Sequence, residues 1–365
     1  MSPALDRYHR QMLLPGIGED GQRRLLGATV LILGCGALGS MAAETLARAG
    51  VGHLVIVDRD FVELTNLQRQ VLFDERDVAD ALPKAEAARL KIARINSQVR
   101  VTAIVDDLDH SNIQRYAAAA DLMIDGLDNF ETRYLANDFA VKHAVPYLYG
   151  GAVGTSGMAF TILPHTREMH AWWEVAPAGN RATPCLRCLF EQAPPAGETP
   201  TCDTAGVIGP AVAMIGSFQA SEALKLLTGN LQYACRTMLS VDLWTNDVMH
   251  LKVAAVRETG DCPCCQRRDF EFLEGRAGSS AIVLCGREAV QLTNRRNRGE
   301  VRLEEIARRL RHFGPVVANE FLIRAEIRDG EQAFELTLFA DGRAIIKGTG
   351  DAAAARSIYA KYVGS

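Results

Sequence analysis

Three absences in the 365-residue sequence narrow the classes of protein that it can encode. No run of apolar residues approaches the eighteen uninterrupted residues of a membrane-spanning helix. The first sixteen residues contain no apolar core of the kind that a secretory signal has. The formal net charge is -4, so the chain lacks the positive excess that favours nucleic acid or membrane surfaces. We therefore expect a cytoplasmic protein with no nucleic-acid partner and no membrane partner.

The cysteines cannot all form disulfides within one chain, because there are nine of them. Four lie in two C-x-x-C pairs, Cys185 with Cys188 and Cys262 with Cys265. Two such pairs are typical of a tetrahedral Zn²⁺ site in a reducing compartment, and four protein sulfurs make that site structural rather than catalytic. Cys264 is an alternative to Cys265 as the fourth metal ligand, and only the C-x-x-C spacing favours Cys265. Reduced thiols or one disulfide are the alternative.

A glycine turn organises the first half of the chain. An apolar stretch from Thr29 to Leu33 is followed at once by G-x-G-x-x-G and then by a predicted helix over 40–49. Such glycines allow a tight turn, let a phosphate approach the backbone and pack the helix on the strand. A second predicted strand, 54–57, ends in an acidic residue placed to bind a ribose hydroxyl. A turn used only for packing is the alternative; the residues predicted to hold a nucleotide are Gly34, Gly36, Ala37, Gly39 and Asp58.

Charged residues after this turn favour a triphosphate over a dinucleotide. A leaving pyrophosphate carries dense negative charge and needs nearby Arg and Lys, whereas an NAD site does not. An aspartate that follows a strand is well placed to hold Mg²⁺. We assign Arg10, Arg69 and Lys84 to the phosphates of ATP, Asp128 to Mg²⁺, and Asp60, Asn66 and Asn129 to the lining of the pocket.

Taken in order, these motifs resemble those of the E1-like adenylyltransferases of the ThiF, MoeB and HesA type. The sequence contains R-Y-x-R-Q, G-x-G-x-L-G, D-x-D, N-L-x-R-Q, P-K and D-N, and the resemblance covers roughly residues 5–269. It implies ATP-dependent adenylation of the C-terminal glycine of a small ubiquitin-like sulfur-carrier protein (MoaD/ThiS type) that ends in Gly-Gly. It also implies a homodimer in which Arg10 reaches into the partner's site. We expect the sulfur donor to be a separate protein.

Other functions share some of these residues. An E1-like enzyme that activates a carboxylate of a small peptide would use the same cations and the same aspartate. An NAD-binding oxidoreductase would keep the glycine turn but would not need Arg69. A non-enzymatic scaffold is disfavoured because all of the phosphate-facing residues are present.

Cys202 lies apart from the zinc-type pairs, before a predicted long helix over 208–227. A thiol near a helix N-terminus can act as a nucleophile. In the resembled family the matching cysteine links covalently to the carrier in one branch and is dispensable in another, so both roles stay open. Trp172 and Trp173 form a pair on a predicted loop, where they either anchor a partner or cap the protein's own core.

Strands and helices alternate up to about residue 150, which predicts an α/β fold with a Rossmann-like, doubly wound, mainly parallel sheet. We expect residues 1–268 to form the ATP-binding adenylation domain with its zinc clamp. Residues 269–365 predict a small α+β domain that carries no recognisable catalytic set and that serves carrier docking or dimer support. Strands of the first domain are predicted at 29–33, 54–57, 99–105, 122–125, 146–150, 157–163 and 238–242.

Overall fold

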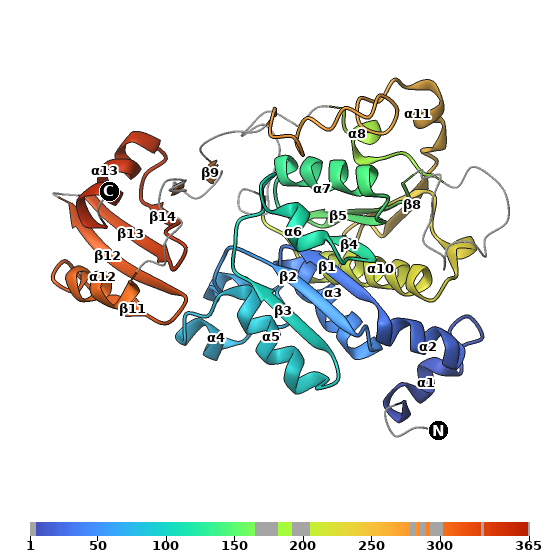
Figure 1. The fold of residues 1–365 in the computed structure, drawn as a ribbon, viewed down its shortest axis with the longest axis horizontal. Coiled ribbons are helices and arrows are strands. Elements are labelled where there is room, and N and C mark those ends of the chain that lie inside the picture. The colour runs from blue at the N-terminus through green and yellow to red at the C-terminus, as the bar shows by residue number, and fades with distance from the viewer. Residues whose placement is uncertain are drawn as a thin grey trace. The chain divides into compact units, whose positions relative to one another are not determined.

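The computed structural model describes residues 5–164, 182–191, 205–277, 282–284, 289–292, 302–329 and 332–363. They form two compact units, each of which we describe by itself (Figure 1). The first unit contains described residues 5–79, 83–164, 182–191 and 205–277; the second contains 80–82 and those from 282 onward. Phe270 lies in the core of the first unit. The domain division after residue 268 stays a prediction about which segments fold independently.

An eight-stranded sheet forms the centre of the first unit, in the order β3-β2-β1-β4-β5-β6-β7-β8. The first five strands of this order pair in parallel, and the rest pair antiparallel, which confirms the predicted mainly parallel sheet. The chain order reverses between β1 and β4, the point at which open α/β sheets bind ligands. The bounds are β1 Thr29–Leu33, β2 His53–Val57, β3 Arg100–Ile104, β4 Leu122–Asp125, β5 Tyr147–Val153, β6 Ser156–Ile162, β7 Met238–Asp242 and β8 Asp247–Leu251.

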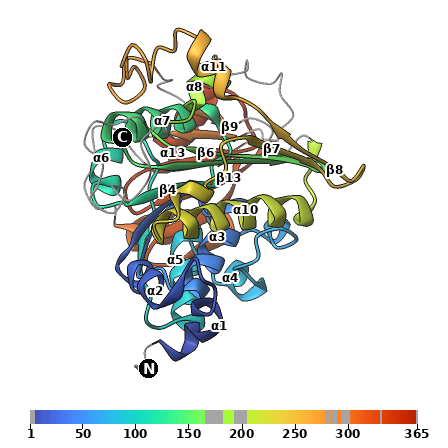
Figure 2. The same ribbon diagram turned by 90° about the vertical axis from the view of Figure 1, so that its right-hand side faces the viewer.

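Helices cover both faces of this sheet, as Figure 2 shows. Side chains of α6 and α7 join one large apolar core with alternate residues of β1, β2 and β4. On the other face α3 packs along α10, and both lie against the sheet. The helices and 3-10 turns are η1 Asp6–Tyr8, α1 His9–Met12, α2 Gly18–Gly27, α3 Ala37–Ala49, η2 Leu64–Asn66, α4 Glu75–Ala79, α5 Lys84–Ile95, α6 Ile113–Ala117, α7 Phe130–His143, α8 Leu186–Leu189, α10 Gly209–Leu227, η4 Leu231–Tyr233 and α11 Ala254–Thr259. No helix among the described residues is long and apolar enough to cross a membrane.

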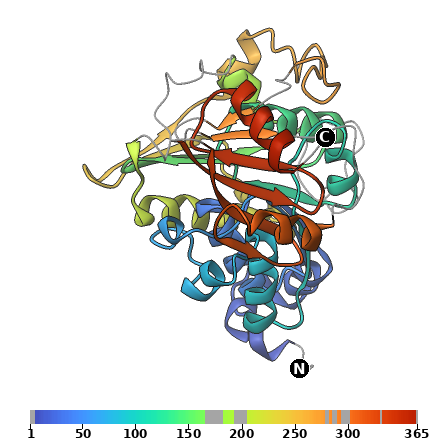
Figure 3. The same cartoon turned by 90° about the vertical axis from the view of Figure 1, so that its left-hand side faces the viewer.

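The second unit is built on a six-stranded antiparallel sheet in the order β11-β12-β13-β14-β10-β9. Helices α12 and α13 bury their apolar residues against one face of it, which confirms the predicted α+β character (Figure 3). A hairpin turn at 340–343 joins β13 to β14, with Gly342 at a φ of 84°. The bounds are β9 Ile282–Leu284, β10 Ala289–Leu292, α12 Leu303–Leu310, β11 Val316–Ala318, β12 Leu322–Asp329, β13 Gln332–Phe339, β14 Ala344–Lys347 and α13 Ala352–Tyr362.

Candidate nucleotide site and metal centre

The glycine turn between β1 and α3 lies at the carboxyl edge of the sheet, where three backbone segments meet. A Cβ on Gly34, whose φ is +81°, would lie 2.6 Å from the carbonyl oxygen of Gly126. A Cβ on Gly39 would lie 1.9 Å from the carbonyl oxygen of Gly34, so both positions need glycine for packing. A Cβ on Gly36 would meet nothing closer than 3.9 Å. Packing therefore does not require glycine at position 36, and its backbone is open to a ligand.

Helix α3 begins at this turn, directly at Ala37 rather than at the predicted Ser40. The N-cap residue Gly36 has no side chain that could cap the helix, and the first backbone hydrogen bond of the helix runs from Ser40 N to Gly36 O at 3.0 Å. The N–H groups of the first turn are thus available to an anion. This arrangement fits a phosphate group.

Asp58 ends β2 and is fixed beside the turn by two hydrogen bonds. Its Oδ2 accepts from Cys35 N at 2.6 Å and its Oδ1 accepts from Asp60 N at 2.7 Å. Burial raises the pKa of this carboxyl, against the lowering effect of the Lys84 ammonium. The carboxylate lies at the end of the second strand, where a ribose-binding acid is expected.

Lys84, the first residue of α5, is buried next to the same carboxylates. Its Nζ lies 3.0 Å from Asp60 Oδ2, and its backbone N–H donates to Asp60 O at 2.9 Å. The ammonium also acts on the pKa values of Cys35 and Asp58, so it is close to the turn. The structure therefore brings Lys84, Asp60 and Asp58 together, as the sequence predicted.

Arg59 belongs to this cluster, although the sequence analysis assigned it no role. Its Nη1 donates to Asp107 Oδ1 at 3.1 Å. Burial alone would lower the pKa of the guanidinium, but the carboxylates of Asp107, Asp60, Asp128 and Asp58 raise it. The signal in the sequence was the position of Arg59 between two aspartates. Its partner Asp107 follows β3, and the local sequence around Arg59 does not reveal this pairing.

Asp128 follows β4 and is exposed. A buried ion pair holds its loop: Arg133 Nε lies 3.1 Å from Oδ2 of the fully buried Asp125, and Arg133 Nη2 donates to Leu127 O at 2.7 Å. Asn129 caps α7, since its Oδ1 accepts from Thr132 N at 2.9 Å, and this cap starts the helix at Phe130. Asp125 and Arg133 are thus site-shaping residues that the sequence analysis did not single out.

The loop that contains Asn66 and Arg69 is shaped by its own hydrogen bonds. The buried Asn66 Oδ1 accepts from Glu63 N at 3.1 Å and completes a capping box on η2. Arg69 Nη1 donates to Thr65 O at 2.9 Å. Asn66 therefore acts on the shape of the loop, and the guanidinium of Arg69 lies against that loop's backbone.

Arg10 is not brought to this cluster. The residues beside it anchor α1 at the amino edge of the sheet: Tyr8 OH accepts from Asn96 Nδ2 at 2.8 Å, and Gln11 Nε2 donates to Ala49 O at 3.0 Å. Residues 49 and 96 precede β2 and β3, whereas the glycine turn follows β1 at the opposite edge. A five-residue strand spans about 16 Å, so the exposed Arg10 lies away from the glycine turn of its own chain.

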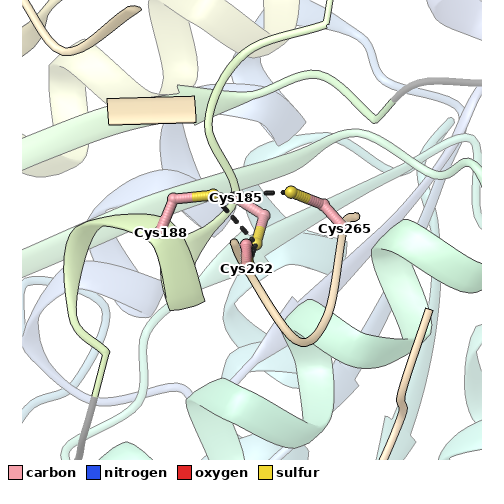
Figure 4. A group of neighbouring side chains, drawn as sticks. All are labelled: Cys185, Cys188, Cys262 and Cys265. Atoms are coloured by element: carbon pink, nitrogen blue, oxygen red, sulfur yellow. Dashed lines mark hydrogen bonds between the residues drawn. The ribbon is translucent and has the colours of Figure 1, made fainter. Parts of the chain in front are cut away.

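The four predicted cysteines converge in the first unit (Figure 4). The Sγ atoms are 3.9 Å apart between Cys185 and Cys188, 3.6 Å between Cys185 and Cys262, and 3.4 Å between Cys188 and Cys265. Tetrahedral zinc with bonds of about 2.3 Å separates its sulfurs by about 3.8 Å. A disulfide would need about 2.05 Å. The donor set therefore fits Zn²⁺.

Cys264 is outside this group, as the C-x-x-C spacing indicated. Its Sγ lies 3.2 Å from Asn137 Nδ2, and Asn137 Oδ1 accepts from Leu186 N at 2.8 Å. The buried Asn137 of α7 thus ties the two cysteine segments together. Cys202 and the pair Trp172-Trp173 lie outside the described residues, so their roles stay predictions.

Comparisons with known proteins agree with this geometry. Residues 8–264 match the model of the ThiF family. The chain is 44% identical over 360 residues to the sulfur carrier protein ThiS adenylyltransferase of Bacillus subtilis, covering 98% of this chain and 99% of that protein. It is 36% identical to the SAMP-activating enzyme E1 of Haloferax volcanii, covering 74% and 92%. A crystal structure of E. coli MccB with ATP matches with a TM-score of 0.58, 20% identity and coverage of 73% and 74%, a likeness of fold alone.

Proposed function

The chain belongs to the ThiF family, and from that premise we propose that it is an ATP-dependent adenylyltransferase. Its substrate is the C-terminal glycine carboxylate of a small ubiquitin-like sulfur-carrier protein that ends in Gly-Gly. A carboxylate oxygen attacks the α-phosphate of ATP, the bond from that phosphorus to pyrophosphate breaks, and an acyl adenylate forms. The observation that carries the proposal is the buried Lys84 ammonium, paired with Asp60 and acting on the pKa of Asp58, next to the open backbone of Gly36.

The repulsion between the glycine carboxylate and the phosphates of ATP explains why this site needs positively charged residues. The glycine carboxylate is already ionised near neutral pH, so no strong general base is needed. Its approach to a polyanion is the obstacle, since two unit charges at 4 Å repel by about 4 kcal/mol at an effective dielectric of 20. Lys84 and Arg69 offset this repulsion at the phosphates. Asp58 holds the ribose, and Asp128 holds Mg²⁺, which supplies further positive charge when bound.

The remaining predicted pocket residues act through the loops. Asp60 holds the ammonium of Lys84 in place at 3.0 Å. Asn66 and Asn129 line the pocket, and their hydrogen bonds to Glu63 N and Thr132 N fix the segments that carry the charged groups. Gly34, Gly36, Ala37 and Gly39 provide the backbone of the phosphate cradle.

We propose a homodimer in which Arg10 enters the nucleotide site of the partner. The position of α1 at the amino edge of the sheet supports this arrangement, because the exposed Arg10 is on the wrong side to serve its own chain. The sulfur donor is a separate protein, and Cys202 is the candidate for a covalent link to the carrier.

A structural Zn²⁺ bound by Cys185, Cys188, Cys262 and Cys265 belongs to the same proposal. When bound, the metal joins α8 to the segment that follows α11. Four thiolates require reducing surroundings, which favours the cytoplasm. Because both segments also pack on α7, the metal stabilises the side of the sheet that carries Asp125 and Asp128.

Activation of a small peptide is the second function that the residues fit. The relatives named as sulfur-carrier adenylyltransferases match at 36% to 44% identity over most of their length, whereas the MccB structures match at 20% to 22%. The sequence relationship thus favours the carrier protein over the peptide.

The test is ATP–pyrophosphate exchange with candidate carrier proteins that end in Gly-Gly. Exchange should need the carrier and should vanish in Asp128→Ala. Glu19→Ala is the matched control, since Glu19 forms an exposed ion pair with Arg23 on α2, and it should exchange at the wild-type rate. Exchange that a short peptide supports and that none of the candidate carrier proteins supports would favour the second function. No exchange with either, together with tight NAD binding, would refute adenylation.

A further inference from the structure

Gln70 is a buried polar side chain at the proposed nucleotide site, and the fold supplies no hydrogen-bond partner for its carboxamide. It follows η2 and is 3% exposed. Its backbone is fixed, because Gln70 N donates to Asn66 O at 3.0 Å and Phe73 N donates to Gln70 O at 3.2 Å. Among the described residues its side-chain Nε2 donates to no acceptor and its buried Oε1 accepts from no donor.

An unpaired amide at a buried position is costly to keep. Burying a carboxamide whose N–H groups have no acceptor and whose oxygen has no donor loses bonds to water, and native proteins pair nearly all such groups. An apolar side chain of similar volume at position 70 would avoid this cost. A position at which a polar residue lowers stability is typical of a site that binds a ligand.

The place of the carboxamide indicates which ligand group it meets. A Cβ built on Gly36 would lie 4.0 Å from Gln70 Nε2 and 3.9 Å from Gly126 O, so the carboxamide borders the gap in front of α3. Asp58, the proposed ribose ligand, is bonded to Cys35 N, one residue before Gly36. The phosphate that follows the ribose is the α-phosphate, which therefore reaches the backbone at Gly36 and the edge of Gln70.

We propose that Gln70 contacts the nucleotide during adenylation and donates a hydrogen bond from Nε2 to an oxygen of the α-phosphate. This inference rests on the proposed function and assigns the residue that touches the phosphorus under attack. Gln70 transfers no proton: the carboxylate oxygen bonds to phosphorus, pyrophosphate departs, and the amide stabilises the charge on the non-bridging oxygen. A neutral donor suits this position, because Lys84 and Arg69 already provide positive charge.

Gln219 provides a matched control of the same residue type. It is 1% exposed and its Oε1 is also unpaired, but its Nε2 donates to Asp125 O and to Leu148 O, each at 2.9 Å. Gln219 thus joins the ends of β4 and β5 and has a structural role. Leucine at position 219 should lower the thermal unfolding midpoint, whereas leucine at position 70 should leave it unchanged or raise it.

The experiment measures unfolding midpoint and exchange kinetics together, on the full chain with its carrier. For Gln70→Leu we expect kcat/KM for ATP to fall by about 10- to 100-fold, the usual effect of losing a bond to a charged group, with no loss of stability. Gln70→Met, which is unbranched like glutamine, is the second variant in case leucine does not pack. Replacing one non-bridging α-oxygen of ATP by sulfur gives two diastereomers, and in one of them the sulfur takes the place of the oxygen that Gln70 contacts. With that diastereomer the exchange rate should fall more in the wild type than in Gln70→Leu.

The outcomes separate this inference from the proposed function. If the wild type exchanges pyrophosphate and both Gln70 variants match its kcat/KM, the contact does not exist and only the inference falls. A parallel loss of stability and activity in both variants would assign Gln70 a packing role instead. If no candidate carrier protein supports pyrophosphate exchange by the wild type, the proposed function is overturned and the inference with it.

Discussion

The buried pair of Asp125 and Arg133 allows a quantitative prediction. Replacing Arg133 by methionine removes a guanidinium that lies 3.1 Å from a fully buried carboxylate and that also donates to Leu127 O and Gly150 O. Methionine fills much of the same volume, so the main effect is an uncompensated buried charge. Removing one partner of such a pair costs about 3–5 kcal/mol. At roughly 2–4 °C per kcal/mol for a large domain, the unfolding midpoint of the first unit should fall by about 6–20 °C.

The pH dependence of this loss has a definite sign. Burial raises the pKa of Asp125 in the folded protein, and Arg133 lowers it. A carboxyl whose folded pKa lies above its unfolded value stabilises the fold most at acid pH, and the contribution is lost as the pH rises through the folded pKa. Without Arg133 the folded pKa rises further. The deficit of Arg133→Met relative to wild type should therefore be smaller near about pH 5.5 than near about pH 8.

Thermal unfolding followed by circular dichroism, with wild type and variant at both pH values, measures this deficit. Adding Asp125→Asn to the variant should restore most of the lost midpoint, because no buried charge then remains. An unfolding midpoint of Arg133→Met within about 2 °C of the wild type at both pH values would be less than the shift from one broken buried pair and would refute this energetic role of Arg133. It is also refuted if the double variant is no more stable than the single one.

Three further predictions concern the metal, the phosphates and the dimer. Cys265→Ser should lose zinc in a metal analysis of the purified protein while Cys264→Ser keeps it, and equal zinc in both would contradict the assignment. Lys84→Met should abolish pyrophosphate exchange without unfolding the protein, and wild-type exchange by this variant would remove Lys84 from the phosphates. Mixing inactive Arg10→Ala with inactive Asp128→Ala, with subunits allowed to exchange, should restore about a quarter of wild-type activity, because half the dimers then contain one complete site. No recovery would argue against a shared site.

The sequence predicted the parts of the fold that local patterns specify. The apolar strand Thr29–Leu33 and the glycines behind it defined the turn, and the C-x-x-C spacing identified Cys265 over Cys264. Strand β8 escaped prediction because all five of its residues are exposed, so no alternation of apolar and polar residues marks it. Strands β6 and β7 were predicted, but not their antiparallel pairing, since strand direction depends on the path of the chain.

Parts of the site depend on contacts between distant segments, which a linear pattern does not show. Arg59 pairs with Asp107, 48 positions away, and Gln219 bonds to Asp125 O, 94 positions away. The unpaired state of Gln70 is visible only once its neighbours are placed. For Asn66 the sequence predicted the location, but its hydrogen bond within a capping box required the backbone geometry.

The cluster of Cys185, Cys188, Cys262 and Cys265 has a consequence for the order of events at the ribosome. Cys188 and Cys262 are separated by 73 residues, so the second pair of thiols is synthesised several seconds after the first, at about 5–20 residues per second. By then all of β1 to β5, which end at Val153, has been translated. Metal binding at the proposed site therefore requires a chain in which all of these strands have already been synthesised. Without the metal, the hydrogen bond from Leu186 N to Asn137 Oδ1 and the contact of Asn137 Nδ2 with Cys264 Sγ are what still join the two cysteine segments to α7.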